Sequence, residues 1–185
     1  LGDSALELQI SADAITPISA VSGIGTATEL AHRAIELSAI ADVPSSEAIA
    51  REMVGAALVY GGDFEGGMVH ANAAVEAAER SKNLFHLVAA YSERAQRYIL
   101  IGDWERAAAD IDVVEVRDPN EVRIQWSTVK MSIDTDDHPK VMEHLGKLWD
   151  MARTDGAISL ARGIGWRSSV VYSYMLGRNI GPPDI

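Results

Sequence analysis

Apolar residues recur at helical spacing over most of the chain after about residue 26. In the clearest window they occupy positions i, i+3, i+4, i+7, i+11 and i+14, at Leu84, Leu87, Val88, Tyr91, Ala95 and Tyr98. This spacing places them on one face of a helix. After Gly102 and Asp103, a second stripe contains Trp104, Ala107, Ala108, Ile111 and Val114. Glycine often ends a helix and aspartate often caps the next, so the pattern predicts two helices joined by a tight turn.

The same pair of stripes occurs twice more. Residues 46–80 contain one copy, around the turn Gly61-Gly62-Asp63, and residues 84–117 contain the copy described above. Residues 120–154 contain a third copy, around a polar turn that runs from Asp134 to Pro139. Helix pairs that repeat every 34 to 40 residues are typical of an α-solenoid, because each pair buries its apolar face only by stacking on its neighbours.

Both ends of the chain contain weaker patterns. We expect partial copies at about 26–42 and 157–180, and we leave residues 1–24 without a firm assignment. Leu6 to Ile10 alternates with the period of a strand, but a helix that ends before Pro17 fits the context better. The sequence therefore predicts a single all-α domain over residues 1–185, an α-solenoid of antiparallel helix pairs.

The copies resemble the tetratricopeptide (TPR) repeat. In that family a small residue and a large residue precede a Gly-Asp-aromatic turn, and a further small residue follows it. The residues that match are Gly55, Leu58, Gly62-Asp63-Phe64, Gly67 and Ala74 in one copy, and Ala95, Tyr98, Gly102-Asp103-Trp104 and Ala107 in the next. The likeness is good over residues 46–118 and weaker elsewhere, because Asp136-Asp137-His138 lacks the glycine and the aromatic residue.

The segment from Ile101 to Ala107 is most similar to the divergent repeats of large bacterial regulators, such as MalT-like transcriptional activators and multidomain nucleotide cyclases. The resemblance implies a non-catalytic module that binds a protein or peptide, or senses a small effector, on the concave face formed by the first helices of the pairs. By the family's pattern Glu52, Ser92 and Gln96 face this groove, with Arg94 at its edge.

Arg94 and Arg97 could together hold a carboxylate, because guanidinium groups bind carboxylates with two parallel hydrogen bonds. The plainer interpretation pairs Arg94 with an acid on its own or a facing helix, such as Glu65 or Glu105, and we favour it. The four tryptophans lie on or near apolar stripes and are expected in the core.

Composition and charge narrow the function. Of the 185 residues 48% are hydrophobic and 23% charged, as in one globular unit, and there is no cysteine, which excludes disulfides and thiolate chemistry. The net charge is -11, the wrong sign for direct nucleic-acid contact or an anionic membrane, and no apolar stretch is long enough for a transmembrane helix. Because the chain begins at Leu1 without a signal-peptide pattern, we expect a cytoplasmic protein and an excised or processed chain.

Two segments could suggest phosphate or metal chemistry. Ser22 to Thr28 is rich in glycine but lacks the lysine of a phosphate-binding loop, so a turn and helix cap are expected there, and the glycines of Arg162 to Trp166 more simply mark close packing or a kink. Asp134, Asp136, Asp137 and His138 lie within five residues, yet their spacing fits no known calcium loop, and acidic turns commonly cap the next helix. His70, His86 and His144 have no partner at metal-ligand spacing. We expect no metal and no cofactor.

Three classes of function remain after these exclusions. The first is the interaction or effector-sensing module of a larger bacterial signalling or transcription-regulatory protein, and we favour it. The second is a structural spacer or self-association element, in which exposed apolar helix edges pair with another copy to give a homo-oligomer. The third is an all-α enzyme whose site the sequence does not identify, because no nucleophile motif is present.

Overall fold

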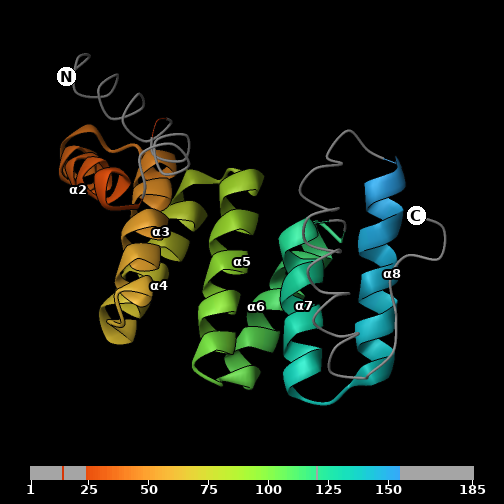
Figure 1. The fold of residues 1–185 in the computed structure, drawn as a ribbon. Coiled ribbons are helices and arrows are strands. Elements are labelled where there is room, and N and C mark those ends of the chain that lie inside the picture. Colours follow the sequence, from red (N-terminus) through yellow and green to blue (C-terminus); the bar gives the residue numbers. More distant parts are fainter. Residues whose placement is uncertain (1–13, 15–23, 120, 155–185) are drawn as a thin grey trace. The chain divides into compact units, whose positions relative to one another are not determined.

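A computed structural model of the chain describes residues 14, 24–119 and 121–154, and every regular element in these ranges is an α-helix. The helices are α2 (Ile24–Ala41), α3 (Pro44–Tyr60), α4 (Phe64–Ser81), α5 (Leu84–Leu100), α6 (Trp104–Arg117), α7 (Val122–Asp134) and α8 (His138–Thr154) (Figure 1). The all-α prediction is confirmed for these residues. The predictions for residues 1–23, for the segment from Arg162 to Trp166 and for the partial copy at 157–180 lie outside the described residues.

The chain divides into two compact units, residues 1–97 and residues 98–185, and the boundary between them lies within α5. Helices α2, α3 and α4 belong to the first unit, and α6, α7 and α8 belong to the second. The single domain expected from the sequence stays a prediction. No helix within the described ranges combines the length and the apolar character that a membrane span requires.

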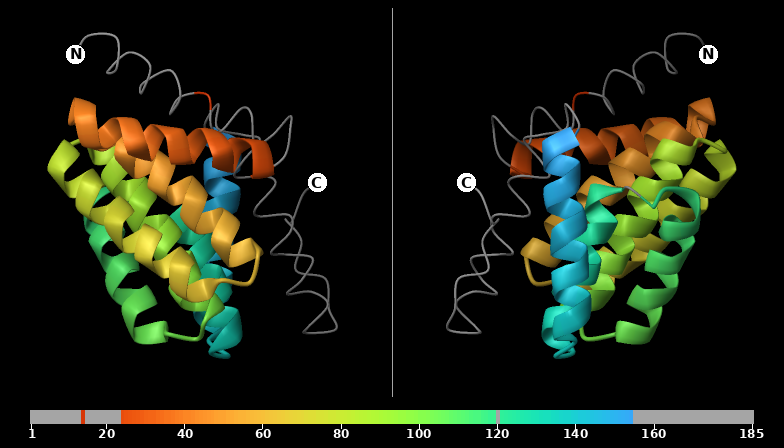
Figure 2. Two further views of the ribbon diagram at one scale, coloured as in Figure 1. Left: turned by 90° about the vertical axis from the view of Figure 1, so that its left-hand side faces the viewer. Right: turned by 90° about the vertical axis from the view of Figure 1, so that its right-hand side faces the viewer.

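In the first unit, α3 and α4 form an antiparallel pair joined by a short turn (Figures 1 and 2). Pro44 lies in the first turn of α3, where a missing N–H breaks no helical hydrogen bond. Asp63 caps α4, because its carboxylate accepts a hydrogen bond from the Gly66 N–H at 2.9 Å. Helix α2 packs against α3 through a cluster of buried residues, which are Ala31, Ala34, Leu37, Ala50 and Val54.

Two glycines allow α3 and α4 to approach closely. A Cβ atom on Gly55 would lie 3.1 Å from the carbonyl oxygen of Gly67, and one on Gly67 would lie 3.0 Å from the carbonyl oxygen of Gly55. These two oxygens are main-chain atoms, which cannot rotate away as a side chain can, and a Cβ atom on Gly67 would also overlap the Val59 side chain of α3. The backbones of the two helices are therefore in contact at this point, and a side chain at either position would push them apart.

The turns before Asp63 and Asp103 have the same geometry. In each, the aspartate N–H donates to the carbonyl five residues earlier, at 2.8 Å and 2.9 Å, and the preceding glycine has a positive φ, 91° at Gly62 and 77° at Gly102. This bond satisfies a carbonyl that the helix end leaves unpaired, and glycine adopts the left-handed conformation without steric cost. The tight turns that the sequence predicted here are confirmed.

The turn between α7 and α8 has this geometry too, although its sequence lacks the glycine. The Asp137 N–H donates to the carbonyl five residues earlier at 2.8 Å, and Asp136 takes the left-handed conformation with φ of 61°. Aspartate is among the few residues with a side chain that tolerate this conformation. The Asp137 carboxylate then accepts from the Lys140 N–H at 3.2 Å, which confirms that this acidic turn caps the next helix.

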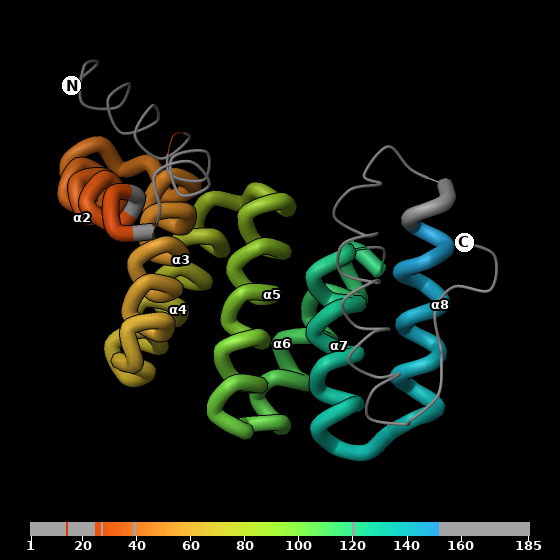
Figure 3. The backbone as a smooth tube through the Cα atoms, viewed as in Figure 1, coloured from red at the N-terminus to blue at the C-terminus, as the bar shows by residue number. Residues whose placement is uncertain are grey.

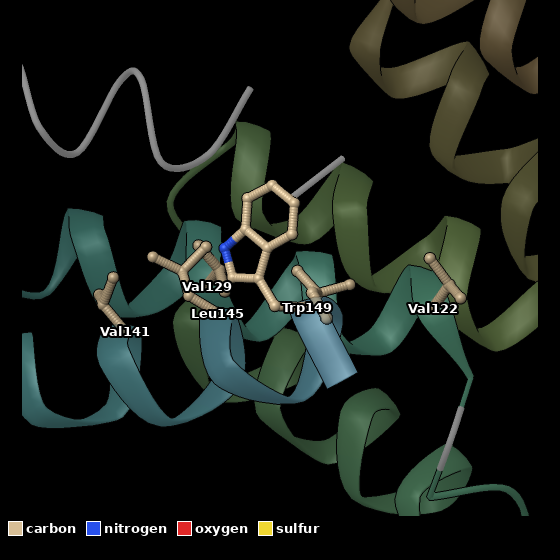
Figure 4. Close-up of a cluster of buried hydrophobic side chains, with 6 residues drawn as sticks. Val122, Val129, Val141, Leu145 and Trp149 are labelled. Carbon is tan, nitrogen blue, oxygen red and sulfur yellow. The ribbon is translucent and has the colours of Figure 1, made fainter. Parts of the chain in front are cut away.

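In the second unit, α7 and α8 form an antiparallel pair, and α6 packs against α7 (Figure 3). The pair is held by a cluster of buried side chains, which are Val122, Val129, Val141, Leu145, Leu148 and Trp149. Figure 4 shows Val129 and Leu145 gathered beside the indole ring of Trp149. Trp149 is thus a core residue, as expected, whereas Trp104 and Trp126 are half-buried and Trp166 lies outside the described residues.

Candidate ligand-binding site

The four residues that the sequence assigns to a binding groove lie on α3 and α5 of the first unit. Glu52, Arg94 and Gln96 are half-buried, so each still reaches solvent. Ser92 differs from the expectation, because its side chain is 0% exposed and its hydroxyl has no hydrogen-bond partner in the described part of the chain. The structure therefore places Ser92 in the interior, and a binding role for the four residues stays a prediction.

Burial around α5 explains this difference. The sequence indicates one apolar stripe, but the structure also buries Ala89, Ser92 and Arg97, which lie outside that stripe, while Leu84 within the stripe is exposed. An amphipathic pattern shows which face of a helix is apolar, yet it does not show how many neighbouring helices cover the other faces. The middle of α5 is covered over much of its circumference, so short polar residues there become interior residues.

Arg94 connects α5 to α4. Its Nη1 donates to the Asn72 side-chain oxygen at 3.1 Å, and its guanidinium lies over the Tyr91 ring at 5.2 Å from the centroid. The Tyr91 hydroxyl in turn donates a hydrogen bond to the Glu79 carboxylate at 2.7 Å. One facing-helix partner of Arg94 is therefore the Asn72 amide on α4, and the expected pairing with an acid such as Glu65 or Glu105 stays a prediction.

Arg97 is the most deeply buried basic residue of the described first unit, with 4% of its surface exposed. Its Nη2 donates to the main-chain carbonyl of Glu52 at 2.9 Å, and its Nη1 is buried with no hydrogen-bond partner among the described residues. A Cβ atom on Gly55 would lie 3.5 Å from Nη2 and 3.3 Å from the His70 Cβ. The glycine thus leaves room for the guanidinium beside His70, where α3, α4 and α5 meet.

His70 is half-buried on α4, and its Nδ1 is also buried without a hydrogen-bond partner in the described ranges. Burial lowers the pKa of His70 from its ordinary value, and the positive charges of Arg51, His32 and Arg97 lower it further. These four side chains come from four different helices. We call them the basic cluster: His32, Arg51, His70 and Arg97.

The charges of the cluster are compensated unequally. The Glu47 carboxylate accepts from Arg51 at 3.1 Å and from Arg80 at 2.6 Å, so Arg51 has a counter-charge. Arg97 forms no ion pair with any described residue, although residues 1–97 contain 13 acidic and only 6 basic side chains. Arginine stays charged at all ordinary pH values, and a buried charge without a partner costs several kcal/mol. The arrangement is suited to binding an anion.

A buried histidine occupies the matching position in the second unit. His144 lies eight residues after the left-handed turn residue Asp136, as His70 lies eight after Gly62. Its Nδ1 is 2.7 Å from the Gln125 side-chain oxygen, and the Gln125 amide donates to the Pro119 carbonyl at 2.9 Å. Because the amide nitrogen donates there, the Gln125 oxygen is the acceptor, and it accepts a hydrogen bond from the Nδ1–H of His144. Burial, with a smaller effect of Lys147, lowers the pKa of His144 to about 4.

The other segments singled out in the sequence gain plain structural roles. Gly25 to Thr28 lie within the first turns of α2, so the helix begins earlier than the turn and cap expected there. His138 lies 3.2 Å from Asp136, and the part of the chain that the structure describes contains no group of three or more side chains that could hold a metal ion.

Sequence reasoning identified Arg97 only as a partner of Arg94, and it considered His70 only as a metal ligand. The structure instead places Arg97 and His70 together, 27 residues apart in the chain. The one sequence signal for this meeting point is Gly55, a small residue that permits close approach. Comparisons with known protein families, with curated proteins and with solved structures found no match for this chain. The TPR-like resemblance therefore stays a prediction.

Proposed function

We propose that this chain is a non-catalytic, TPR-like helical-repeat module that binds a protein or peptide partner or senses a small effector, within a larger bacterial signalling or transcription-regulatory protein. In this proposal the helix pairs stack as an α-solenoid, and the first helices of the pairs form the binding surface. The observation that carries it is the recurrence of one turn geometry, at Gly62, Gly102 and Asp136, at intervals of 40 and 34 residues.

The recurrence extends to the helices beside the turns. Seven residues before and five after each left-handed residue, the chain has a matched pair of buried residues of equal size: Gly55 and Gly67, Ala95 and Ala107, and Val129 and Val141. The same local unit three times in succession supports a repeat architecture. Repeat architectures present extended surfaces on consecutive helices, and these surfaces typically bind other proteins or peptides.

Half-buried polar side chains support the assignment of the surface to α3 and α5. Glu52, Arg94 and Gln96 combine partial exposure with side chains that can donate or accept hydrogen bonds. Arg94 is held in place by Asn72 and Tyr91, so less conformational entropy is lost when a partner binds it.

A peptide selection tests the proposal. The full 185-residue chain is used to select binders from a displayed random peptide library, and the affinity of a selected peptide is measured by fluorescence anisotropy. We expect Gln96→Glu to weaken binding at least about tenfold, because it replaces an amide donor by a charge at the proposed surface. The control is Gly146→Glu, which adds the same charge at an exposed position on α8.

Circular dichroism of both variants should match that of the unchanged chain. A library that yields no peptide with saturable binding contradicts the peptide-binding form of the proposal and leaves only the small-effector form. Equal weakening by the two variants would show that the binding surface lies elsewhere, and that charge alone causes the effect.

Self-association is a second candidate, because large apolar side chains are exposed on the described helices. Tyr60 is 79% exposed, and Phe85 and Val116 are exposed as well. Exposed apolar residues of this size often mark contacts between proteins. Light scattering over a dilution series tests this candidate: a molar mass that falls with dilution supports a homo-oligomer, and a constant monomer mass excludes it.

A further inference from the structure

We propose that the basic cluster of the first unit binds the carboxylate group of a ligand, held between Arg97 and His70. This inference rests on the proposed binding role of the chain, and it names the chemistry of one group that the chain recognises. The group is supplied either by a small carboxylic acid or by an acidic peptide.

The first argument is the missing counter-charge. The Arg97 guanidinium is 4% exposed, and its one hydrogen bond to a described residue is to the uncharged carbonyl of Glu52. Buried charges in proteins are normally paired, because removing an ion from water is costly. The positive charge of Arg97 is therefore left for an anion that the described residues do not supply.

The second argument is the missing hydrogen-bond acceptor. Nη1 of Arg97 and Nδ1 of His70 are both buried, and neither has a partner among the described residues. In the matching place of the other unit, Gln125 supplies an oxygen to His144. Gln125 lies eleven residues before the left-handed residue Asp136, and Arg51 lies eleven residues before Gly62, so the two occupy equivalent positions. The first unit thus has a hydrogen-bond donor, Arg51, where the second has an acceptor, the Gln125 oxygen. The first unit thus lacks an oxygen at this position.

A carboxylate fits these two requirements. It has a single negative charge, which matches the single uncompensated charge of Arg97, and two oxygens, one for each unpaired nitrogen when His70 has its proton on Nδ1. A phosphate group has a larger charge, and Arg51 is already paired with Glu47, so the second negative charge would lack a partner. A Cβ position on Gly55 lies 3.5 Å from the Arg97 Nη2 atom and 3.3 Å from the His70 Cβ atom, so these two side chains lie close together.

The cluster also reaches the surface. His32 is exposed on α2, and the Arg51 side chain is 26% exposed on α3. The exposed part of the cluster is basic, in a half of the chain that is otherwise acidic, so a carboxylate that approaches from solvent meets less repulsion there. This contrast favours binding at the cluster over the rest of the first unit.

Nuclear magnetic resonance of the histidine rings tests the proposal on the full chain. Acetate, succinate and inorganic phosphate are titrated separately at constant pH and constant ionic strength, and the ring ¹⁵N signals of His70 and His144 are followed. We expect acetate or succinate to shift the His70 signals with saturation, and to leave His144 unchanged because its nitrogen already has a partner. His144 is thus an internal control in the same molecule.

Two variants sharpen the experiment. Arg97→Gln should weaken the carboxylate affinity at least tenfold, because it removes the buried charge, and Arg117→Gln, on α6 of the second unit, should leave it unchanged. Because Arg97→Gln could unfold the first unit, its circular dichroism is measured first. If that variant is unfolded, the wild-type titration alone decides the proposal.

Each remaining outcome has a defined meaning. A His70 shift that does not saturate, an equal shift of His144, or tighter binding of phosphate than of carboxylates overturns the proposal. If the small acids do not bind, a library-selected acidic peptide is titrated in the same way: saturation at His70 then identifies a peptide carboxylate as the ligand group, and no saturation overturns the inference.

The inference and the proposed function can fail separately. Peptide binding that is insensitive to Arg97→Gln, with no carboxylate effect at His70, leaves the proposed function intact and removes the carboxylate site. A carboxylate effect at His70 in a chain that selects no peptide supports the site and contradicts a peptide-binding module.

Discussion

Helices α4 and α8 follow turns of the same geometry, and their buried faces can be compared position by position. Counted from the left-handed turn residue, four matching positions contain Gly67, Ala71, Ala74 and Val75 in α4, and Val141, Leu145, Leu148 and Trp149 in α8. Every residue is larger in α8. The first pair brings its backbones into contact through Gly55 and Gly67, whereas the second fills the space between its helices with side chains.

The comparison teaches that one turn can serve two kinds of helix packing. The turn sets the direction of the second helix through a few main-chain hydrogen bonds, and these bonds do not depend on the size of the residues along the helices. Packing then depends on the buried side chains. The two pairs should therefore respond in opposite ways when a buried residue is made smaller or larger.

The largest effect is expected where a large residue of α8 is reduced to its counterpart in α4. Leu148 is completely buried, and its counterpart is Ala74. Leu148→Ala should lower the free energy of unfolding of the second unit by roughly 3 to 4 kcal/mol, since it removes buried methyl groups and leaves a cavity. Urea unfolding followed by tryptophan fluorescence measures this unit, because all four tryptophans lie in residues 98–185. Met142→Ala, at an exposed position of α8, is the control, and a loss below about 1 kcal/mol for Leu148→Ala would contradict side-chain packing of this pair.

The second effect is on pH dependence in the same unit. The pKa of His144 is lowered to about 4 by burial, while a histidine in the unfolded chain titrates near its ordinary pKa of 6.5. Between these values the unfolded chain binds a proton that the folded chain does not. Neutral His144 therefore contributes up to about 3 kcal/mol to the free energy of unfolding above pH 6.5. This contribution is lost as the pH falls from 6.5 to about 4.

Urea unfolding at several pH values, compared between the unchanged chain and His144→Gln, isolates this contribution from that of the carboxylates. The difference in unfolding free energy between the two proteins should shrink as the pH falls from 6.5 to 4. A difference that stays constant over this range would show that His144 titrates normally in the folded protein.

The smallest effects on stability are expected from alanine at two glycine positions, one with close neighbours and one without. Gly67→Ala should lower the unfolding free energy of the first unit by about 2 kcal/mol, because its Cβ atom would overlap the Val59 side chain and press on the Gly55 carbonyl oxygen. Gly146→Ala should raise that of the second unit by about 0.5 to 1 kcal/mol, since nothing lies within 4 Å of its Cβ position and alanine favours a helix. Helical circular dichroism in urea measures both. Stabilisation by Gly67→Ala would refute close packing of α3 and α4 at this point.

The helices and most of their ends could be predicted from the sequence, because the responsible interactions are local. The stripes from Leu84 to Tyr98 and from Trp104 to Val114 predicted α5 and α6, and Gly102 with Asp103 predicted the turn between them. The likeness of the third turn to the others was missed. Its left-handed residue is Asp136, and a motif based on glycine does not recognise an aspartate in the same conformation.

The candidate site was largely beyond prediction. The sequence assigned Ser92 to an open groove, but the structure buries it. Apart from the small residue Gly55 itself, it gave no sign that Arg97 and His70 flank this glycine on a third helix. Such meetings depend on which helix faces cover one another, and the spacing of apolar residues within one helix does not specify this.

By itself, the sequence determined where this chain forms helices and where it turns, because hydrogen bonds, capping side chains and left-handed residues act within a few residues of one another. Only the tertiary structure determined which polar groups are buried away from solvent, namely Arg97 beside His70, and His144 against Gln125. The physical reason is that desolvation is a property of three-dimensional neighbours. A charged side chain at the margin of an apolar stripe is solvated or buried according to what packs over it.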